Sequence, residues 1–315
     1  MFNAESLVDT QIRKIKEKVT GKAIIACSGG VDSVVSAVIA SKAIGDRLLA
    51  VYVNTGLMRK GETEEVRGML GSMNVNFKIL DADNIFFEGL KGITDPEAKR
   101  KIIGEKFIRC FEKEAKEFGA KYLVQGTIAP DWIESGEGGR DVVKSHHNVG
   151  GIPKEMDLEL VEPLRDLYKD EVRQVARFLG IEVSERQPFP GPGLSVRCLG
   201  EVTPENIAIV REACHIVEDE IQKASADGKM ELPWQYFAAL LPIRSVGVRD
   251  GKRVYGMTVV VRAVLSKDGM TAKCAHIPFS VLESVSARIA GEMGDKVNRV
   301  VYDITNKPPA TIEWE

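Results

Sequence analysis

The chain has 315 residues, of which 44% are hydrophobic, and a formal net charge of −3 at pH 7. This length supports two domains with apolar cores, and the slight negative charge argues against a broad basic surface for nucleic acid. No apolar run is long enough to span a bilayer, and the first 18 residues are charged and amphipathic, unlike a signal peptide. Five scattered cysteines without a Cys-x-x-Cys pair fit a reducing compartment. We therefore expect a cytoplasmic protein that binds neither nucleic acid nor membrane.

Apolar strands and amphipathic helices alternate along the first two thirds of the chain. This alternation predicts an α/β fold with a doubly wound parallel sheet covered on both faces. The predicted strands lie at 23–27, 48–54, 75–80 and 122–126, and the predicted helices begin at Val31, Glu62 and Pro96. Ligands of such sheets bind beyond the carboxyl ends of the strands, where Ser28, residues 54–59 and residues 125–127 should converge.

A short glycine-rich loop joins the first predicted strand to the first predicted helix. Its residues are Ser28, Gly29, Gly30, Val31, Asp32 and Ser33. Two glycines let the backbone approach an anion, and the N–H groups of the first helical turn point towards it. The serines add hydroxyl donors, while Asp32 beside a phosphate makes sense if a divalent cation lies between them. The loop therefore predicts a site for a polyphosphate and its metal.

Two common phosphate loops do not fit this sequence. A Walker loop ends in Lys followed by Ser or Thr, and a dinucleotide fingerprint needs three glycines at another spacing. The hexapeptide instead resembles the pyrophosphate loop of N-type ATP pyrophosphatases, which adenylylate a substrate oxygen and release pyrophosphate. The remaining alternative is a glycine-rich turn without a ligand.

Residues 129–154 lack regular periodicity and are rich in glycine and charge. A loop of this length is usually a functional lid or a disordered insertion. We expect a lid that carries Lys144, His146 and His147 towards the phosphates. A histidine metal site is disfavoured, because adjacent histidines in an extended segment point in opposite directions. A solvated loop is the other alternative.

The sequence Pro-Phe-Pro-Gly-Pro-Gly at residues 188–193 cannot continue a helix or a central strand and indicates a domain boundary. We therefore predict a first domain at 1–187, with a lid loop at about 129–154, and a smaller α+β domain at 188–315. The predicted elements of the second domain lie at 204–224, 237–241, 254–265, 279–293 and 299–303. The strand at 254–265 is so apolar that it is either core or an edge covered by a partner. The proline-rich tail at 307–315 would fray unless something holds it.

Several segments together resemble the ATP pyrophosphatase part of GMP synthases, and the match runs essentially from end to end. Besides the loop, the matching segments are 54–60, 130–135, 144–149, 162–166, 188–193 and 307–315. The loop alone is shared with NAD synthetase, argininosuccinate synthase and tRNA-thiolating enzymes. The lid sequence together with the tail is far more specific.

The resemblance implies a ligase that aminates XMP to GMP at the expense of ATP. The xanthine O2 of XMP attacks the α-phosphorus, giving adenylyl-XMP and pyrophosphate, and ammonia then displaces AMP. Mg²⁺ held in part by Asp32 would stabilise the departing pyrophosphate. The implied catalytic residues are Lys144, Asp131, Glu134, His146 and His147. The implied XMP ligands are Arg59, Lys307, Ile312 and Glu313.

Many GMP synthases carry a glutamine amidotransferase module, but only about 22 residues precede the first predicted strand here. The chain thus resembles the synthetase subunit of two-subunit, archaeal-type GMP synthases. We expect a separate glutamine amidotransferase subunit to supply the ammonia. The resemblance also implies a homodimer through the second domain, and the apolar strand at 254–265 offers a reason for it.

Three other functions compete with this interpretation. A tRNA thiolase needs catalytic cysteines and a basic surface, which the isolated Cys110 and Cys198 and the negative charge do not favour. NAD synthetase shares the ATP loop, but nothing here matches its nicotinate-binding elements. A nucleotide-gated binding module needs only the loop and leaves the lid and the tail unexplained.

Overall fold

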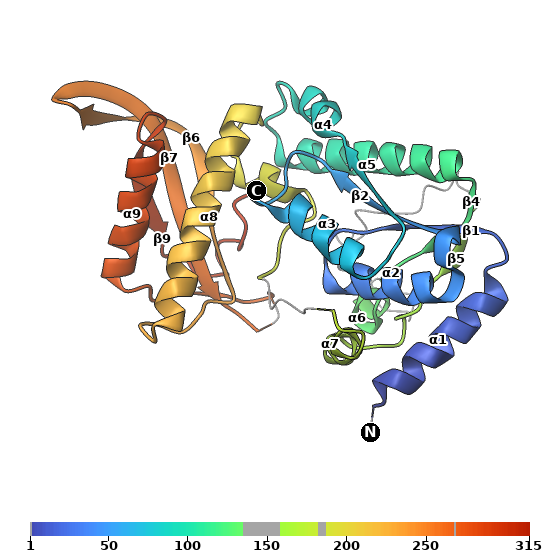
Figure 1. Cartoon of the computed structure of the whole chain (residues 1–315). Coiled ribbons are helices and arrows are strands. Elements are labelled where there is room, and N and C mark those ends of the chain that lie inside the picture. The colour runs from blue at the N-terminus through green and yellow to red at the C-terminus, as the bar shows by residue number, and fades with distance from the viewer. Residues whose placement is uncertain (1, 135–157, 182–186, 268) are drawn as a thin grey trace. The chain divides into compact units, whose positions relative to one another are not determined.

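The computed structural model describes residues 2–134, 158–181, 187–267 and 269–315 (Figure 1). The chain divides into two compact units. The first comprises residues 1–55, 61–83 and 104–185, and the second comprises residues 56–60, 84–103 and 186–315. The second unit thus includes two short segments that lie before residue 188 in the sequence.

The first unit contains a parallel five-stranded sheet in the order β3-β2-β1-β4-β5 (Figure 1). The strands are β1 (Lys22–Ala26), β2 (Leu48–Asn54), β3 (Phe77–Asp81), β4 (Ala120–Val124) and β5 (Glu159–Val161). The chain proceeds from β1 to β3 in one direction and returns to β4 on the other side of β1. This reversal is the switch point of a doubly wound sheet, so the predicted fold class is confirmed.

Helices pack around this sheet. They are α1 (Ala4–Lys18), α2 (Val31–Ile44), α3 (Glu62–Ser72), α6 (Ala129–Glu134) and α7 (Lys169–Phe178), with a 3-10 turn η1 (Gly45–Arg47) after α2. Helix α2 is buried continuously from Val34 to Ala40 and contacts both α1 and α7. Because α2 is held in the core, its first turn is fixed at the carboxyl end of β1. Residues 28–33 therefore occupy a rigid position.

The second unit packs helices against a mixed sheet (Figure 1). Its elements are α4 (Asp83–Leu90), η2 (Gly193–Arg197), α8 (Pro204–Ala226), β6 (Gln235–Arg249), β7 (Lys252–Leu265), β8 (Lys273–Cys274), α9 (Phe279–Met293) and β9 (Val297–Asp303). Helix α5 (Pro96–Phe118) begins in this unit and ends in the first. Among these elements α4 and β8 were not predicted from the sequence, and in the first unit α1, α7 and β5 were not.

Strand β7 is the central strand of the second sheet. It pairs with β6 and β8 in antiparallel fashion and with β9 in parallel, and residues 259–261 are almost fully buried. Of the two interpretations of its apolar sequence, core is therefore correct. The suggestion that this strand is a bare edge in need of a second copy is wrong, because β6 and β9 already cover both of its edges.

None of the helices within the described ranges combines the length and the apolarity needed to cross a membrane.

Candidate active site

The loop at residues 28–33 connects the end of β1 to the start of α2, as predicted. Gly29 has a φ of +82°, and a Cβ atom there would lie 2.7 Å from Val66 Cγ2, so a larger residue would be strained. The Ser33 hydroxyl donates to the Gly30 carbonyl at 2.9 Å, and its oxygen lies 3.3 Å from Ser28 Oγ. Two hydroxyls thus lie beside the N–H groups of the first turn of α2, which favours anion binding.

Asp32 lies in that first turn with its two carboxylate oxygens in different surroundings. Its Oδ2 accepts a hydrogen bond from Lys169 Nζ at 2.5 Å. Its Oδ1 is buried and has no hydrogen-bond partner in the described part of the chain. Leaving a buried charged oxygen without a partner is costly, and Mg²⁺ prefers oxygen ligands of this kind. Asp32 therefore fits a divalent cation carried with a polyphosphate.

Lys169 is a candidate that the sequence analysis missed. It is the first residue of α7, and 137 positions separate it from Asp32. The acidic Asp170 and Glu171 that follow are typical of a helix start, which is the one local signal available. Nothing in the sequence connects this helix start with the loop, because the packing of α7 against α2 brings the two together.

The end of β4 approaches the loop from the neighbouring strand position. A Cβ atom on Gly126 would lie 2.9 Å from the Asp32 carbonyl carbon and 3.0 Å from the Ser33 nitrogen. Only glycine permits this approach without a shift of the loop. Ser28, Asn54 and Gln125 thus follow three adjacent parallel strands. Residues 56–60 belong to the second unit, so their convergence on the same site stays a prediction.

The predicted lid residues are only partly described. Asp131 lies on the short helix α6, and its Oδ2 accepts from the backbone N–H of Ile128 at 2.9 Å. Glu134 ends this helix, and its side chain lies outside the described residues. Lys144, His146 and His147 lie outside them as well. Within the described ranges, no cluster of three or more His, Cys, Asp or Glu residues could hold a metal.

Arg59, a predicted XMP ligand, lies in a polar and aromatic setting within the second unit. Its Nη2 donates to the Gln187 carbonyl at 2.8 Å, and its Cζ lies 4.3 Å from the centroid of the Phe189 ring. Glu218 approaches its Nε at 4.0 Å. Burial raises the pKa of the Glu218 carboxyl, while the positive charges of Arg59 and Arg197 oppose this shift.

The tail at 307–315 is held by cations that are fully buried within the second unit. Lys99 pairs with the side chain of Glu315, and Arg197 Nη2 lies 2.8 Å from Glu313 Oε1. Both cations have no solvent exposure. A buried cation requires such a carboxylate, so the tail is an internal part of the unit. The expectation that something holds the tail is confirmed.

A third fully buried cation, Arg262, donates to the main-chain carbonyl of Thr311 at 3.0 Å. Lys307 Nζ donates to the Gly269 carbonyl at 2.8 Å, and Ile312 is buried. The predicted XMP ligands Lys307, Ile312 and Glu313 are therefore ordered by contacts with the unit itself.

The cysteines in this chain lie in inert surroundings. Burial raises the pKa of the Cys198 thiol to about 12 and also raises that of Cys110. A thiol with a raised pKa is a poor nucleophile at neutral pH. These two positions therefore do not support the chemistry of a tRNA thiolase.

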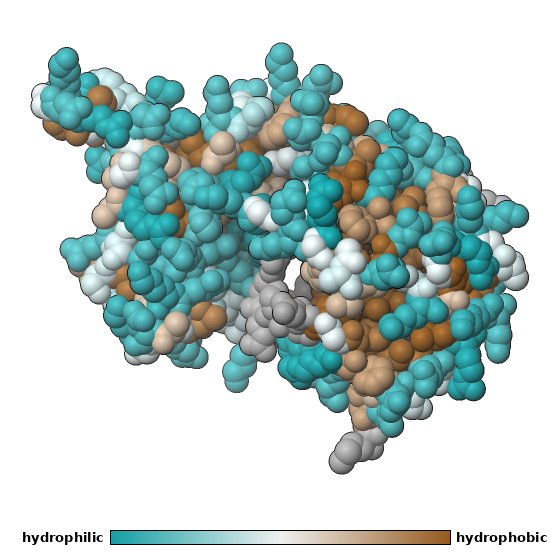
Figure 2. Space-filling view, in the orientation of Figure 1, coloured by the Kyte–Doolittle hydropathy of each residue, from teal (hydrophilic) through white to brown (hydrophobic). Residues whose placement is uncertain are grey.

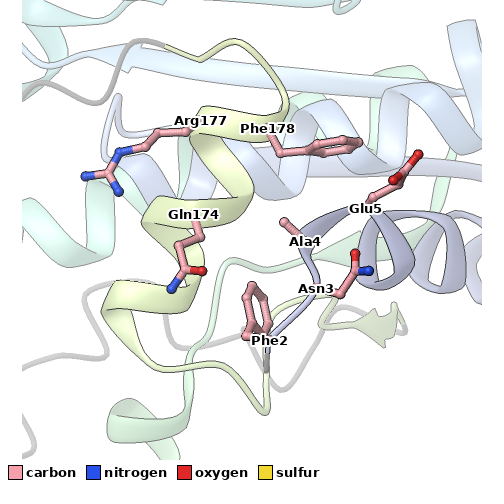
Figure 3. Close-up of a pocket in the computed structure, with 7 residues that line it drawn as sticks. All are labelled: Phe2, Asn3, Ala4, Glu5, Gln174, Arg177 and Phe178. Carbon is pink, nitrogen blue, oxygen red and sulfur yellow. The ribbon is translucent and has the colours of Figure 1, made fainter.

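A pocket of about 510 Å³ lies between the start of α1 and helix α7 (Figure 3). Its lining residues are Phe2, Asn3, Ala4, Glu5, Gln174, Arg177 and Phe178. None of them belongs to the predicted nucleotide or metal site.

Comparison with known families matches both parts of the chain. The NAD synthase family matches residues 4–103, and the family described as GMP synthase C terminal domain matches residues 219–314. Among solved structures, NMN synthetase from Francisella tularensis has a TM-score of 0.48 and 14% identity, and the match covers 66% of this chain and 85% of that chain.

Curated relatives match the whole chain, and their names designate the second of the subunits of a glutamine-hydrolyzing GMP synthase. The relative from Thermoplasma acidophilum is 56% identical over 314 residues, which is 100% of both chains. The relative of the same name from Pyrococcus abyssi is 55% identical over 318 residues, again 100% of both. At this level of identity over the full length, the chain belongs to this family of GMP synthase subunits.

Proposed function

We propose that this chain is the ATP pyrophosphatase subunit of a two-subunit GMP synthase and aminates XMP to GMP. The observation that supports this most is the loop at the start of α2. There, two hydroxyls, the first-turn N–H groups, Lys169 and the half-partnered Asp32 lie together. The names of the relatives, which specify a GMP synthase and one subunit of it, support the substrate class and a partner subunit.

In the first step, the xanthine O2 of XMP attacks the α-phosphorus of ATP and pyrophosphate leaves. Ser28, Ser33 and the N–H groups of α2 donate hydrogen bonds to the departing phosphates, where negative charge develops. Bound Mg²⁺ supplies positive charge at these phosphates. Asp32 holds that ion through Oδ1, the oxygen without a described partner. Lys169 contributes a second cation beside it.

In the second step, ammonia attacks C2 of the adenylyl-XMP intermediate and AMP leaves. We assign Lys144 to the α-phosphate and Asp131, Glu134, His146 and His147 to the lid that closes over it. Closure excludes water, which would otherwise hydrolyse the intermediate. A separate glutamine amidotransferase subunit supplies the ammonia in the cytoplasm.

XMP contacts are assigned to the second unit. Arg59 and the tail residues Lys307, Ile312 and Glu313 bind the nucleotide, the lysine at the 5′-phosphate and the carboxylate at N–H groups of the base. In this proposal the domain at 1–187 provides the ATP site, and the domain at 188–315 completes the XMP site.

Replacing Asp32 with alanine should abolish XMP-dependent pyrophosphate release, because the metal-phosphate unit loses its carboxylate ligand. Lys169 remains partly exposed and can be hydrated, so the fold should persist, as checked by circular dichroism. Asp46→Ala is the matched control, since Asp46 is exposed just beyond the other end of α2. Wild-type turnover by folded Asp32→Ala would rule out the metal role.

The purified chain should make GMP from XMP and ATP when ammonium salts are supplied, but not when glutamine is supplied. The reason is that glutamine hydrolysis belongs to the partner subunit. Nucleotide analysis by chromatography, together with a glutaminase assay, measures both outcomes. Glutamine-dependent GMP formation by this chain alone would contradict the two-subunit proposal, and failure with ammonium would contradict the activity itself.

Lys307→Ala should raise the KM for XMP by about tenfold or more and leave the KM for ATP nearly unchanged, because one charge-assisted contact to phosphate is lost. Lys273→Ala is the matched control, as Lys273 is an exposed lysine on β8 close to the bridge between Ala272 and Lys307. Steady-state kinetics with ammonium separates the two KM values. Equal effects of both substitutions would remove Lys307 from the XMP site.

We also propose a homodimer formed through the second unit, on a surface other than the edge of β7. Beyond the core, β6 and β7 continue as a two-stranded ribbon that exposes Val248 (78%) and Tyr255 (62%) (Figure 1, upper left). Apolar side chains appear among polar ones at this end of the molecule (Figure 2). Exposed apolar residues on a ribbon are typical of an interface.

Light scattering should therefore give the mass of a dimer for the wild-type chain and a lower mass for Val248→Asp, because a buried charge opposes association. The control is Phe178→Asp, which places a charge on a half-exposed aromatic residue of the first unit and should leave the mass unchanged. A wild-type monomer at assay concentration would contradict the dimer.

A further inference from the structure

Arg197 is held more tightly than any structural role in the core requires. It ends the 3-10 turn η2 and is fully buried. Its Nε and Nη2 donate to Glu313 Oε2 and Oε1 at 3.0 and 2.8 Å, which is a two-pronged contact. Its Cζ lies 4.1 Å from the centroid of the Phe237 ring. Stacking and the paired hydrogen bonds together fix the plane of the guanidinium.

The pair is ionised in spite of its burial. Desolvation alone would lower the pKa of Arg197, but the charge and the hydrogen bonds of Glu313 outweigh it and raise the pKa. Glu313 is consequently an acceptor at both oxygens rather than a hydroxyl donor.

A third donor completes the setting of this carboxylate. Gln235 is buried on β6, and its Nε2 donates to Glu313 Oε1 at 2.7 Å and to the Pro188 carbonyl at 3.2 Å. A carboxylate offers about four acceptor positions, and the three described donors leave capacity for one more. Because 19% of the Glu313 side chain is exposed, this remaining capacity is accessible from outside the unit.

The ring of Phe189 connects Arg197 with another predicted XMP ligand. Its centroid lies 5.2 Å from Arg197 Cζ and 4.3 Å from Arg59 Cζ. Arg59 and Glu313 are thus arranged around a shared aromatic ring and the buried guanidinium of Arg197.

We propose that Arg197 is a positioning residue for XMP, which holds the Glu313 carboxylate in one orientation so that it accepts an N–H group of the xanthine base. Arg197 itself does not touch the nucleotide. This inference rests on the proposed function, in which Glu313 binds XMP. It assigns the recognition of the base to a preformed carboxylate and gives Gln235 a supporting part in the same task.

The other two buried cations act differently. Lys99 grips the side chain of Glu315, and Arg262 grips main-chain carbonyls of the tail. Neither contacts Glu313 in the described structure. They hold the tail in the fold, whereas Arg197 sets the direction of one functional group.

The first test is Arg197→Lys, which keeps the positive charge but loses the planar fork. With ammonium as nitrogen source, the KM for XMP should rise by about tenfold, because one oriented charge-assisted acceptor is lost, while the KM for ATP and kcat at saturating XMP change less than about twofold. Arg288→Lys is the matched control: Arg288 contacts Glu220 and Glu292 in the same unit, away from the tail. It should leave both KM values unchanged.

A double-mutant cycle then tests whether Arg197 acts through Glu313. Glu313→Gln should raise the KM for XMP, and adding Arg197→Lys to that variant should raise it by less than about twofold more, since coupled residues are not additive. Full additivity of the two effects would overturn the proposal. If Arg197→Lys does not fold, Gln235→Met carries the test, with the same selective rise in the KM for XMP and the same loss of effect in the Glu313→Gln background.

The outcomes separate this inference from the function on which it rests. If the wild-type chain makes no GMP from XMP, both fall. If it makes GMP and Glu313→Gln leaves the KM for XMP unchanged, the inference is overturned and the activity stands. If Glu313→Gln raises this KM but Arg197→Lys affects thermal stability alone, or shifts the KM for ATP equally, only the positioning role of Arg197 is overturned.

Discussion

The second unit depends on the pairing of buried cations with the end of the chain. Lys99 and Arg197 have no solvent exposure, and each finds its carboxylate within the last three residues, at Glu315 and Glu313. Breaking a buried pair by removing one partner costs roughly 3–5 kcal/mol, because the remaining charge stays desolvated. The tail is therefore required for the stability of the unit. Deleting it would confound any measurement of XMP binding with unfolding, so single substitutions are the informative experiments.

This arrangement also has a consequence for binding. A terminal segment that became ordered only with its ligand would lose conformational entropy at that moment and weaken the affinity. Here the contacts of Arg197, Arg262 and Lys307 order the tail beforehand. The same ion pairs that stabilise the unit thus preorganise the proposed XMP ligands, which couples the stability of the fold to recognition of the substrate.

The sequence predicted those features that are local in the chain. The strand, loop and helix around residues 28–33 could be recognised because the apolar run, the glycines and the helical spacing are consecutive. The contact between Asp32 and Lys169 could not, since it depends on how α7 packs against α2. Arg197 and Lys99 were missed for another reason: charged residues are normally exposed, and no pattern indicates which ones will be buried with a distant carboxylate. The apolar sequence of β7 fitted a core strand or a covered edge, and only the pairing with β6 and β9 decided between them.

The two proposed sites balance charge in different ways. On the XMP side, the buried cations keep permanent partners, so the ligand meets a fixed carboxylate. On the ATP side, Asp32 and Lys169 neutralise each other at 2.5 Å while Asp32 Oδ1 keeps no described partner. A polyphosphate with its metal can replace this pair without leaving a net charge behind, because the metal takes the carboxylate and a phosphate oxygen takes the ammonium. Since both side chains are partly exposed, the exchange avoids the large desolvation penalty that opening the Arg197–Glu313 pair would incur. An exchangeable pair suits a nucleotide that must be cleaved and released in each cycle, and a permanent pair suits the recognition of a base that keeps its identity through the reaction.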